Sequence, residues 1–68
     1  MSEFYFLHRT NSLQTAMRLK NILIEHGIPA TVQEFNEDQI KYFYVKVIKK
    51  DRRESQIILK KFIRGDVY

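Results

Sequence analysis

The sequence predicts an α+β fold in which two helices lie on one face of a three-stranded antiparallel sheet, in the order βαββα. Two of the observations behind this prediction are runs of apolar residues at helical spacing, over residues 13–26 and again over 52–64. The length of 68 residues allows one domain, spanning 1–68, with one small core. Three further segments are rich in aromatic or β-branched residues and are bounded by polar or turn-forming residues, as strands are: 3–9, 30–35 and 40–48.

The first strand leads directly into the first helix. The aromatic segment 3–9 is too short for a helix and runs into polar residues 10–12, which are typical of a helix start. Asn11 and Gln14 have the spacing of a capping box, and Gly27 suits the left-handed residue that ends a helix. The apolar residues on one side of the expected helix are Leu13, Ala16, Met17, Leu19, Leu23 and Ile24.

The second half of the chain contains a hairpin and a second helix. Pro29 prevents continuation of the first helix, and a polar turn over 36–39 separates the second and third strands. Asp51 and Glu54 repeat the capping-box spacing, and Gly65 follows the last helical residue. The apolar side of this helix carries Ile58, Leu59, Phe62 and Ile63, and a fourth strand stub is expected over 66–68.

Connection rules then fix the topology. A right-handed crossover makes the first two strands parallel, and a tight hairpin makes the second and third antiparallel. With the third strand in the middle, the sheet has the ferredoxin-like order, and its second face stays open. Unpaired strand edges and an open face favour self-association, so we expect a homodimer formed either strand to strand or face to face.

The segment LIEHGIPATV at 23–32 precedes an apolar strand and a final helix of the form KKDRRESQIILKKF. This pattern resembles a group of small bacterial signal-transducing proteins with a fold related to the PII (GlnB-like) regulators. Regulatory ACT domains have a comparable helix-to-strand turn. The resemblance implies a small regulatory or binding domain and supplies no catalytic residue. The residues that match are Thr10, Asn11, Leu19, Leu23, Gly27, Ile28 and Pro29.

The resemblance also bears on small ligands. The turn at 36–39 leaves no room for the nucleotide-binding loop of true PII proteins. Binding of a small metabolite, in the manner of ACT or PII domains, would need a pocket built at a subunit interface, because so short a chain encloses little space.

Positive charge is concentrated in the second half of the chain. The formal net charge is +4, with −2 over residues 1–40 and +7 over 41–64. This basic half is suited to an acidic protein or to nucleic acid, although basic residues also solvate a helix and complement its C-terminus. On the outer side of the last helix we expect Arg53, Ile57, Lys60, Lys61 and Arg64.

The open sheet face is the main candidate site. If Phe43, Val45 and Val47 face the helices, then Tyr42, Tyr44 and Lys46 face away. The first strand then exposes either Tyr5 and Leu7 or the set Phe4, Phe6 and His8.

Aromatic and basic residues on such a face have two interpretations. RNA-recognition motifs stack single-stranded bases on the equivalent strands, but their glycine and aromatic spacing is absent from the third strand here. Exposed aromatic patches are also typical of protein interfaces. We therefore expect an adaptor that binds a protein or a second copy, with single-stranded RNA or DNA as the alternative. The predicted binding residues are Tyr5, Tyr42, Tyr44, Lys46, Arg53, Ile57, Lys60, Lys61 and Arg64.

Other sites have less support. The start of the first helix could hold an anion through Arg9, Thr10, Asn11 and Ser12, although ordinary capping explains the same residues. The chain has no cysteine, and His8 and His26 lack metal-ligand spacing. We therefore expect no enzyme activity, no metal and no cofactor. The sequence has neither a long apolar run nor the pattern of a signal peptide, which predicts a cytoplasmic protein without membrane contact.

Overall fold

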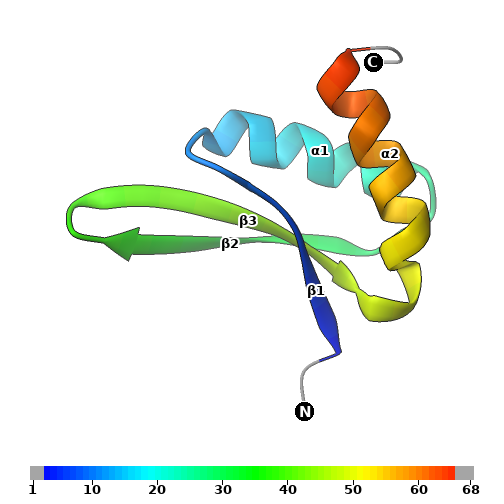
Figure 1. Cartoon of the computed structure of the whole chain (residues 1–68), viewed down its shortest axis with the longest axis horizontal. Coiled ribbons are helices and arrows are strands. Elements are labelled where there is room, and N and C mark those ends of the chain that lie inside the picture. The colour runs from blue at the N-terminus through cyan, green and yellow to red at the C-terminus, as the bar shows by residue number, and fades with distance from the viewer. Residues whose placement is uncertain (1–2, 66–68) are drawn as a thin grey trace.

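The computed structural model describes residues 3–65. It confirms the predicted order βαββα (Figure 1). A 3-10 turn at Lys49–Asp51 joins the last strand to the second helix. The strand stub expected over 66–68 lies outside the described residues. The elements are β1 (Phe4–Thr10), α1 (Leu13–Glu25), β2 (Ala30–Glu37), β3 (Ile40–Ile48) and α2 (Arg52–Arg64).

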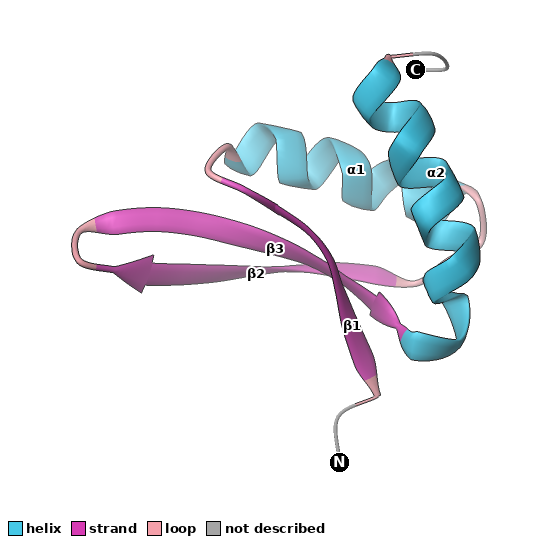
Figure 2. Ribbon diagram, viewed as in Figure 1, coloured by secondary structure: helices cyan, strands magenta, loops and turns pink. Residues whose placement is uncertain are grey.

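The sheet has the predicted topology. Its strand order is β1-β3-β2, and β3 runs antiparallel to both neighbours. Both helices lie on the same side of the sheet (Figure 2). α1 packs mainly on β2 and β3, whereas α2 packs mainly on β1. The arrangement is ferredoxin-like and leaves the other face without a helix from residues 3–65.

A bulge in β1 breaks the alternation expected from the sequence. Phe6 lies opposite Lys46 and His8 lies opposite Val45, so Leu7 is an extra residue between two regular pairs. Because of this insertion, Leu7 and His8 both lie on the helix-covered side. Phe4 and Phe6 therefore point to the open face without His8, and neither predicted set of exposed residues is correct as a whole.

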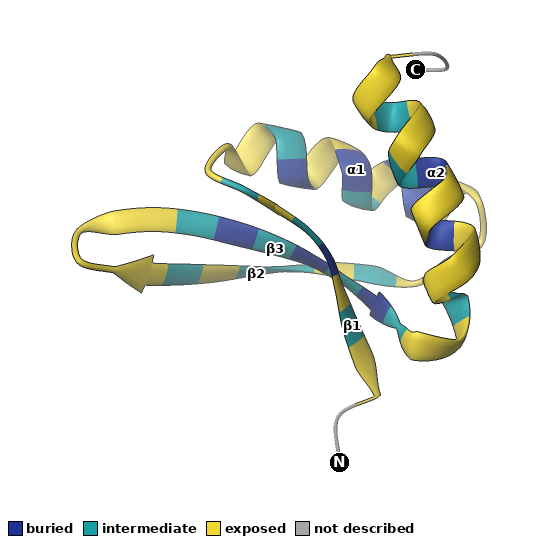
Figure 3. Ribbon diagram, in the orientation of Figure 1, coloured by how far each residue is buried: buried dark blue, intermediate teal, exposed yellow. Residues whose placement is uncertain are grey.

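One small core lies between the sheet and the helices (Figure 3). The alternation expected for β3 is confirmed, because Phe43, Val45 and Val47 are buried in this core. A sheet of three strands covers only a narrow arc of each helix, so several predicted core residues remain exposed. These are Leu13, Met17 and Ile24 on α1 and Ile63 on α2, while Ile22 is buried in their place. The core residues are Leu7, Ala16, Leu19, Ile22, Leu23, Ile28, Phe43, Val45, Val47 and Ile58.

The helix caps differ in detail from the prediction. Ser12, not Asn11, caps α1, because its Oγ accepts a hydrogen bond of 3.1 Å from the amide of Thr15. Asp51 precedes α2 but makes no side-chain capping bond. It ends the 3-10 turn with φ −95° and ψ 6°, whereas a capping side chain usually starts from extended backbone.

The turns follow from left-handed residues. Gly27 and Gly65 have φ of 82° and 70°, which confirms them as helix ends. Asp38 and Gln39 also have positive φ, at 52° and 68°. This makes a two-residue hairpin of the kind that matches strand twist, so β2 continues to Glu37, two residues beyond the predicted strand end.

Candidate functional site

The candidate site is the open face of the sheet. Directly opposed residues of antiparallel strands point to the same side, so the register assigns each side chain to a face. The predicted outward orientation of Tyr42, Tyr44 and Lys46 is confirmed by their pairing with open-face residues. This face is formed by Phe4, Phe6 and Arg9 of β1, Thr31, Gln33 and Phe35 of β2, and Tyr42, Tyr44, Lys46 and Ile48 of β3.

Four rings from all three strands form an aromatic cluster, consisting of Phe6, Phe35, Tyr42 and Tyr44. Phe6 stacks on Tyr44, with centroids 4.7 Å apart and ring planes 25° apart. Phe35 stacks on Tyr42 at 5.6 Å and 13°. Edge-to-face contacts of Phe35 with Tyr44 at 5.4 Å, and of Tyr42 with Tyr44 at 5.8 Å, join the two stacks. Such contacts hold the rings in one arrangement, because they add to the stabilisation from burial alone.

The stacked pairs determine what the cluster offers to a partner. At centroid separations of 4.7 and 5.6 Å the nearly parallel rings of each pair are offset, so each ring covers part of one face of the other. Edge-to-face contacts of Tyr44 with Phe35 and with Tyr42 occupy further ring surface. The cluster therefore offers a partner an apolar surface that carries two tyrosine hydroxyl groups and whose ring faces are partly occupied.

Two cations flank the cluster. The guanidinium carbon of Arg9 lies 4.5 Å from the ring centroid of Tyr42. Lys46 Nζ lies 4.9 Å from the ring centroid of Phe4. Both contacts have the geometry of cation–π interactions, which position a positive charge without a carboxylate. The aromatic face is therefore positively charged at its borders.

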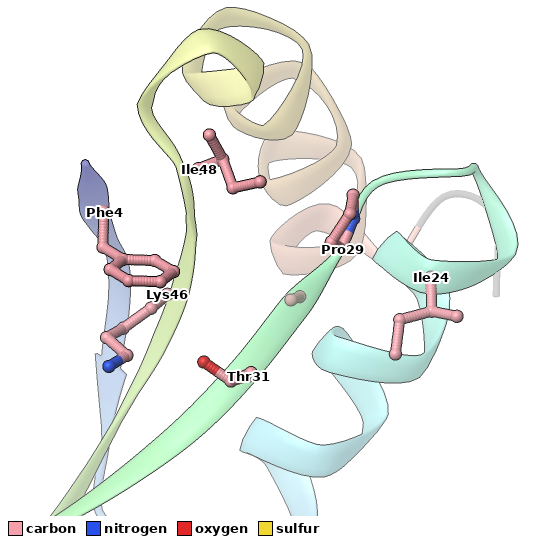
Figure 4. Close-up of a pocket in the computed structure, with 7 residues that line it drawn as sticks. Phe4, Ile24, Pro29, Thr31, Lys46 and Ile48 are labelled. Carbon is pink, nitrogen blue, oxygen red and sulfur yellow. The ribbon is translucent and has the colours of Figure 1, made fainter.

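A shallow hollow of about 280 Å³ adjoins the aromatic face at the start of β2. Figure 4 shows Phe4 and Lys46 on one side and Ile24 with Pro29 on the other. Its remaining lining residues are Ala30, Thr31 and Ile48. The lining is almost entirely apolar, so an apolar side chain of a partner would fit its chemistry.

Tyr5, a predicted binding residue, lies on the other face of the sheet. It pairs with the buried Val47 and packs against the core. Its hydroxyl oxygen accepts a 2.8 Å hydrogen bond from Gln56 Nε2, and Arg52 lies 5.9 Å from its ring. Tyr5 therefore connects β1 to α2 and takes no part in the open face.

The basic residues of α2 form a second, separate surface. Ser55 and Ile58 direct one side of α2 into the core, and Ile57 is 54% exposed on the opposite side. The helix lies in the layer that covers the other face of the sheet (Figure 2). The predicted binding residues thus do not form one site. Those of α2, all exposed, are Arg53, Ile57, Lys60, Lys61 and Arg64.

The residues of the predicted anion site are divided in the same way. Ser12 Oγ caps α1, and Thr10 Oγ1 accepts a 3.1 Å hydrogen bond from the amide of Ser12. Arg9 points to the aromatic face, over Tyr42. Asn11 is exposed and is not the cap. Capping accounts for Thr10 and Ser12.

Sequence reasoning did not place Phe35 or Arg9 on the open face, and it gave Phe6 only as one of two alternatives. Phe35 could have been found, because it shares the period-two spacing of Thr31 and Gln33 in β2. Arg9 depends on the bulge at Leu7, because regular alternation from Phe4 and Phe6 would place it on the helix-covered side.

Residues 3–65 contain neither a cluster of metal ligands nor a membrane-spanning helix. No group of three or more His, Cys, Asp or Glu residues in this range could hold a metal ion. No helix within it is long and apolar enough to cross a bilayer. Comparison of the chain with protein-family models, with curated proteins and with solved structures finds no match in any of the three.

Proposed function

We propose that the chain is a small non-enzymatic regulatory or adaptor protein that binds a protein partner through the aromatic face of its sheet. The observation that carries this proposal is the aromatic cluster itself, on a face without a helix from residues 3–65. Phe4 and Phe6 are each 50% exposed there. Contiguous apolar surface bordered by charged groups is a common sign of a protein interface.

The charges on this face indicate the chemistry of the partner. Arg9 and Lys46 are both positive and are both held against rings. A complementary surface would present apolar side chains to the cluster and carboxylates to the two cations, which increases the association rate as well as specificity. An apolar side chain next to an acidic one would fill the hollow and reach Lys46.

The alternative function is binding of single-stranded RNA or DNA. The cations Arg9 and Lys46 and the net charge of +4 favour it. Base stacking, however, needs free ring faces, and in the pairs Phe6–Tyr44 and Phe35–Tyr42 each ring partly covers one face of the other. This mutual coverage favours a protein over bases. The regulatory role itself follows from the resemblance carried by residues 23–32.

The proposal is tested with two single variants that introduce the same charge on different layers. Tyr44→Glu changes the aromatic face, and Ile63→Glu changes an exposed residue of α2 that is 64% accessible. A partner captured from a lysate of the source organism is then purified, and its affinity for each variant is measured by calorimetry. We expect Tyr44→Glu to abolish binding and Ile63→Glu to leave it unchanged.

Two results would contradict the proposal. One is equal affinity of the wild type and the Tyr44→Glu variant for the purified partner. The other is binding of labelled single-stranded RNA or DNA at physiological salt that is lost in a Tyr44→Ala variant, which would establish the alternative function.

A further inference from the structure

The outer edge of β2 is a regular strand edge. β2 lies at one side of the sheet, and its register with β3 runs without a shift from Ala30 to Glu37. β1, at the other side, contains the bulge at Leu7. Bulges protect an edge against pairing, whereas a regular edge presents a row of backbone donors and acceptors to another strand. Of the two edges, β2 is therefore the better suited to pair with a further chain.

An exposed apolar stripe of α1 lies beside this edge. Leu13, Met17 and Ile24 are 52%, 37% and 49% exposed, and Lys20 is half-buried. These four residues, the α1 stripe, lie within about 60° of one another on a regular helix. Ile24 lines the hollow together with Pro29 and Thr31, which places the stripe on the β2 side of α1 (Figure 4). Among residues 3–65, neither the outer edge of β2 nor the α1 stripe beside it pairs with another strand or helix.

The α1 stripe is complementary to itself. Its residues are separated by four, three and four positions, a spacing that reads the same in either direction. Two antiparallel copies therefore match residue by residue, with Leu13 opposite Ile24 and Met17 opposite Lys20. The two lysines do not meet, and each lysine stem packs against a methionine. The spacing is also that of apolar positions along a helix-packing seam.

We propose that the chain forms a homodimer in which β2 pairs antiparallel with β2 of a second copy, while the two α1 stripes pack against each other. Both contacts obey one two-fold axis, as required of an interface between identical patches. The three strands of each copy then form a single sheet, and the two aromatic faces lie on the same side of it. Phe35 is the one cluster residue on β2, and the pairing uses its backbone and not its ring, so this inference does not rest on the proposed function.

The opposition of Met17 and Lys20 allows a sharp test by sedimentation equilibrium. Met17→Lys places a lysine opposite Lys20 twice, and we expect the dimer to weaken about 10- to 100-fold. Met17→Glu places a carboxylate opposite the same lysine and should preserve the dimer. Lysine and glutamate have similar helix propensities, so the two variants differ mainly in the sign of the charge.

Two further variants complete the experiment. Adding Lys20→Glu to Met17→Lys exchanges the charges and should restore the dimer. Ile63→Lys, on the exposed side of α2, should leave the wild-type dimer unchanged. Circular dichroism confirms that each variant is folded. Tyr44→Glu should prevent partner binding without affecting the dimer, which separates failure of this inference from failure of the proposed function.

The inference is overturned if the wild-type chain sediments as a monomer throughout the micromolar to millimolar range. It is also overturned if Met17→Lys and Met17→Glu have equal effects, because the antiparallel pairing of Met17 with Lys20 would then be wrong. A dimer that dissociates in Met17→Lys and recovers when Lys20→Glu is added establishes it.

Discussion

Phe6 and Tyr44 stack across β1 and β3, with ring centroids 4.7 Å apart and planes inclined by 25°. Phe6 lies on the open face directly before the bulge at Leu7, opposite Lys46 of the third strand. The stack joins two of the three strands on the side away from the helices. The open face is thus a packed layer of side chains in its own right, although Phe6 remains 50% exposed.

The stack should contribute to folding as well as to binding. We expect Phe6→Ala to lower the free energy of unfolding by about 0.5–1.5 kcal/mol through the lost ring contacts, in addition to the lost burial. Urea denaturation measures this change. Ile63→Ala serves as the control, because that side chain is 64% exposed and lies outside the cluster. Equal losses in the two variants would show that the stack adds no stability.

Tyr5 is expected to stabilise the fold and to make no contact with the partner. Tyr5→Phe removes the hydroxyl that accepts the hydrogen bond from Gln56 and keeps the ring in place. A partly exposed bond of this kind contributes about 0.5–1.5 kcal/mol, so thermal unfolding should shift modestly downward. Affinity for the partner should not change. A marked loss of affinity would mean that the helix-covered side of β1 takes part in binding.

Two serines should respond to alanine with opposite signs. Ser55 is fully buried on α2, and its Oγ has no hydrogen-bond partner among the described residues. Removing an unpaired buried hydroxyl should raise the free energy of unfolding by about 1 kcal/mol, helped by the higher helix propensity of alanine. Ser12→Ala removes the cap of α1 and should lower the free energy of unfolding by about 1 kcal/mol. Chemical denaturation of both variants checks the prediction, which a destabilised Ser55→Ala would contradict.

The stability of the fold should depend on pH through His8. Burial lowers the pKa of His8 below its ordinary value of 6.5, because the charged ring loses hydration. At a pH just below 6.5 the unfolded chain therefore binds a proton that the folded protein does not. Above pH 6.5, His8 should therefore leave the free energy of unfolding unchanged. Below pH 6.5, this free energy should fall until the pH has passed the lowered pKa of the folded protein.

Urea midpoints measured between pH 7.5 and 5 test this dependence, with His8→Gln as the control. We expect the variant to show a smaller fall over this range than the wild type. Identical pH profiles would indicate that His8 is equally hydrated in the folded and unfolded states.

Local patterns predicted most of the fold, because element type and face depend on neighbouring residues. Alternation in β3 placed Tyr42 and Tyr44 on the open face, and the glycines at 27 and 65 marked both helix ends. The bulge at Leu7 could not be predicted in this way, because it arises from the register between β1 and a strand more than thirty residues away in sequence. Tyr5 was misplaced because alternation alone does not say which of the two faces of β1 the helices cover.

Which residues lie together in the site also depends on how the chain folds back on itself, and a local sequence pattern does not show this. Basic residues of β3 and α2 follow one another in the sequence and were counted together as one basic half of the chain. The chain direction reverses at the 3-10 turn, so Lys46 and Arg53 lie on different layers of the molecule. Charge counted along the chain therefore overstated the charge available at the aromatic face.

The most direct test of the binding face is NMR spectroscopy of the labelled chain during titration with the purified partner. We predict that the largest shifts occur at the ring signals of Phe6, Phe35 and Tyr44, with signals from α2 nearly unchanged. Largest shifts at Arg53, Lys60 and Arg64, with the ring signals of the cluster unmoved, would place the binding surface on α2 and contradict it.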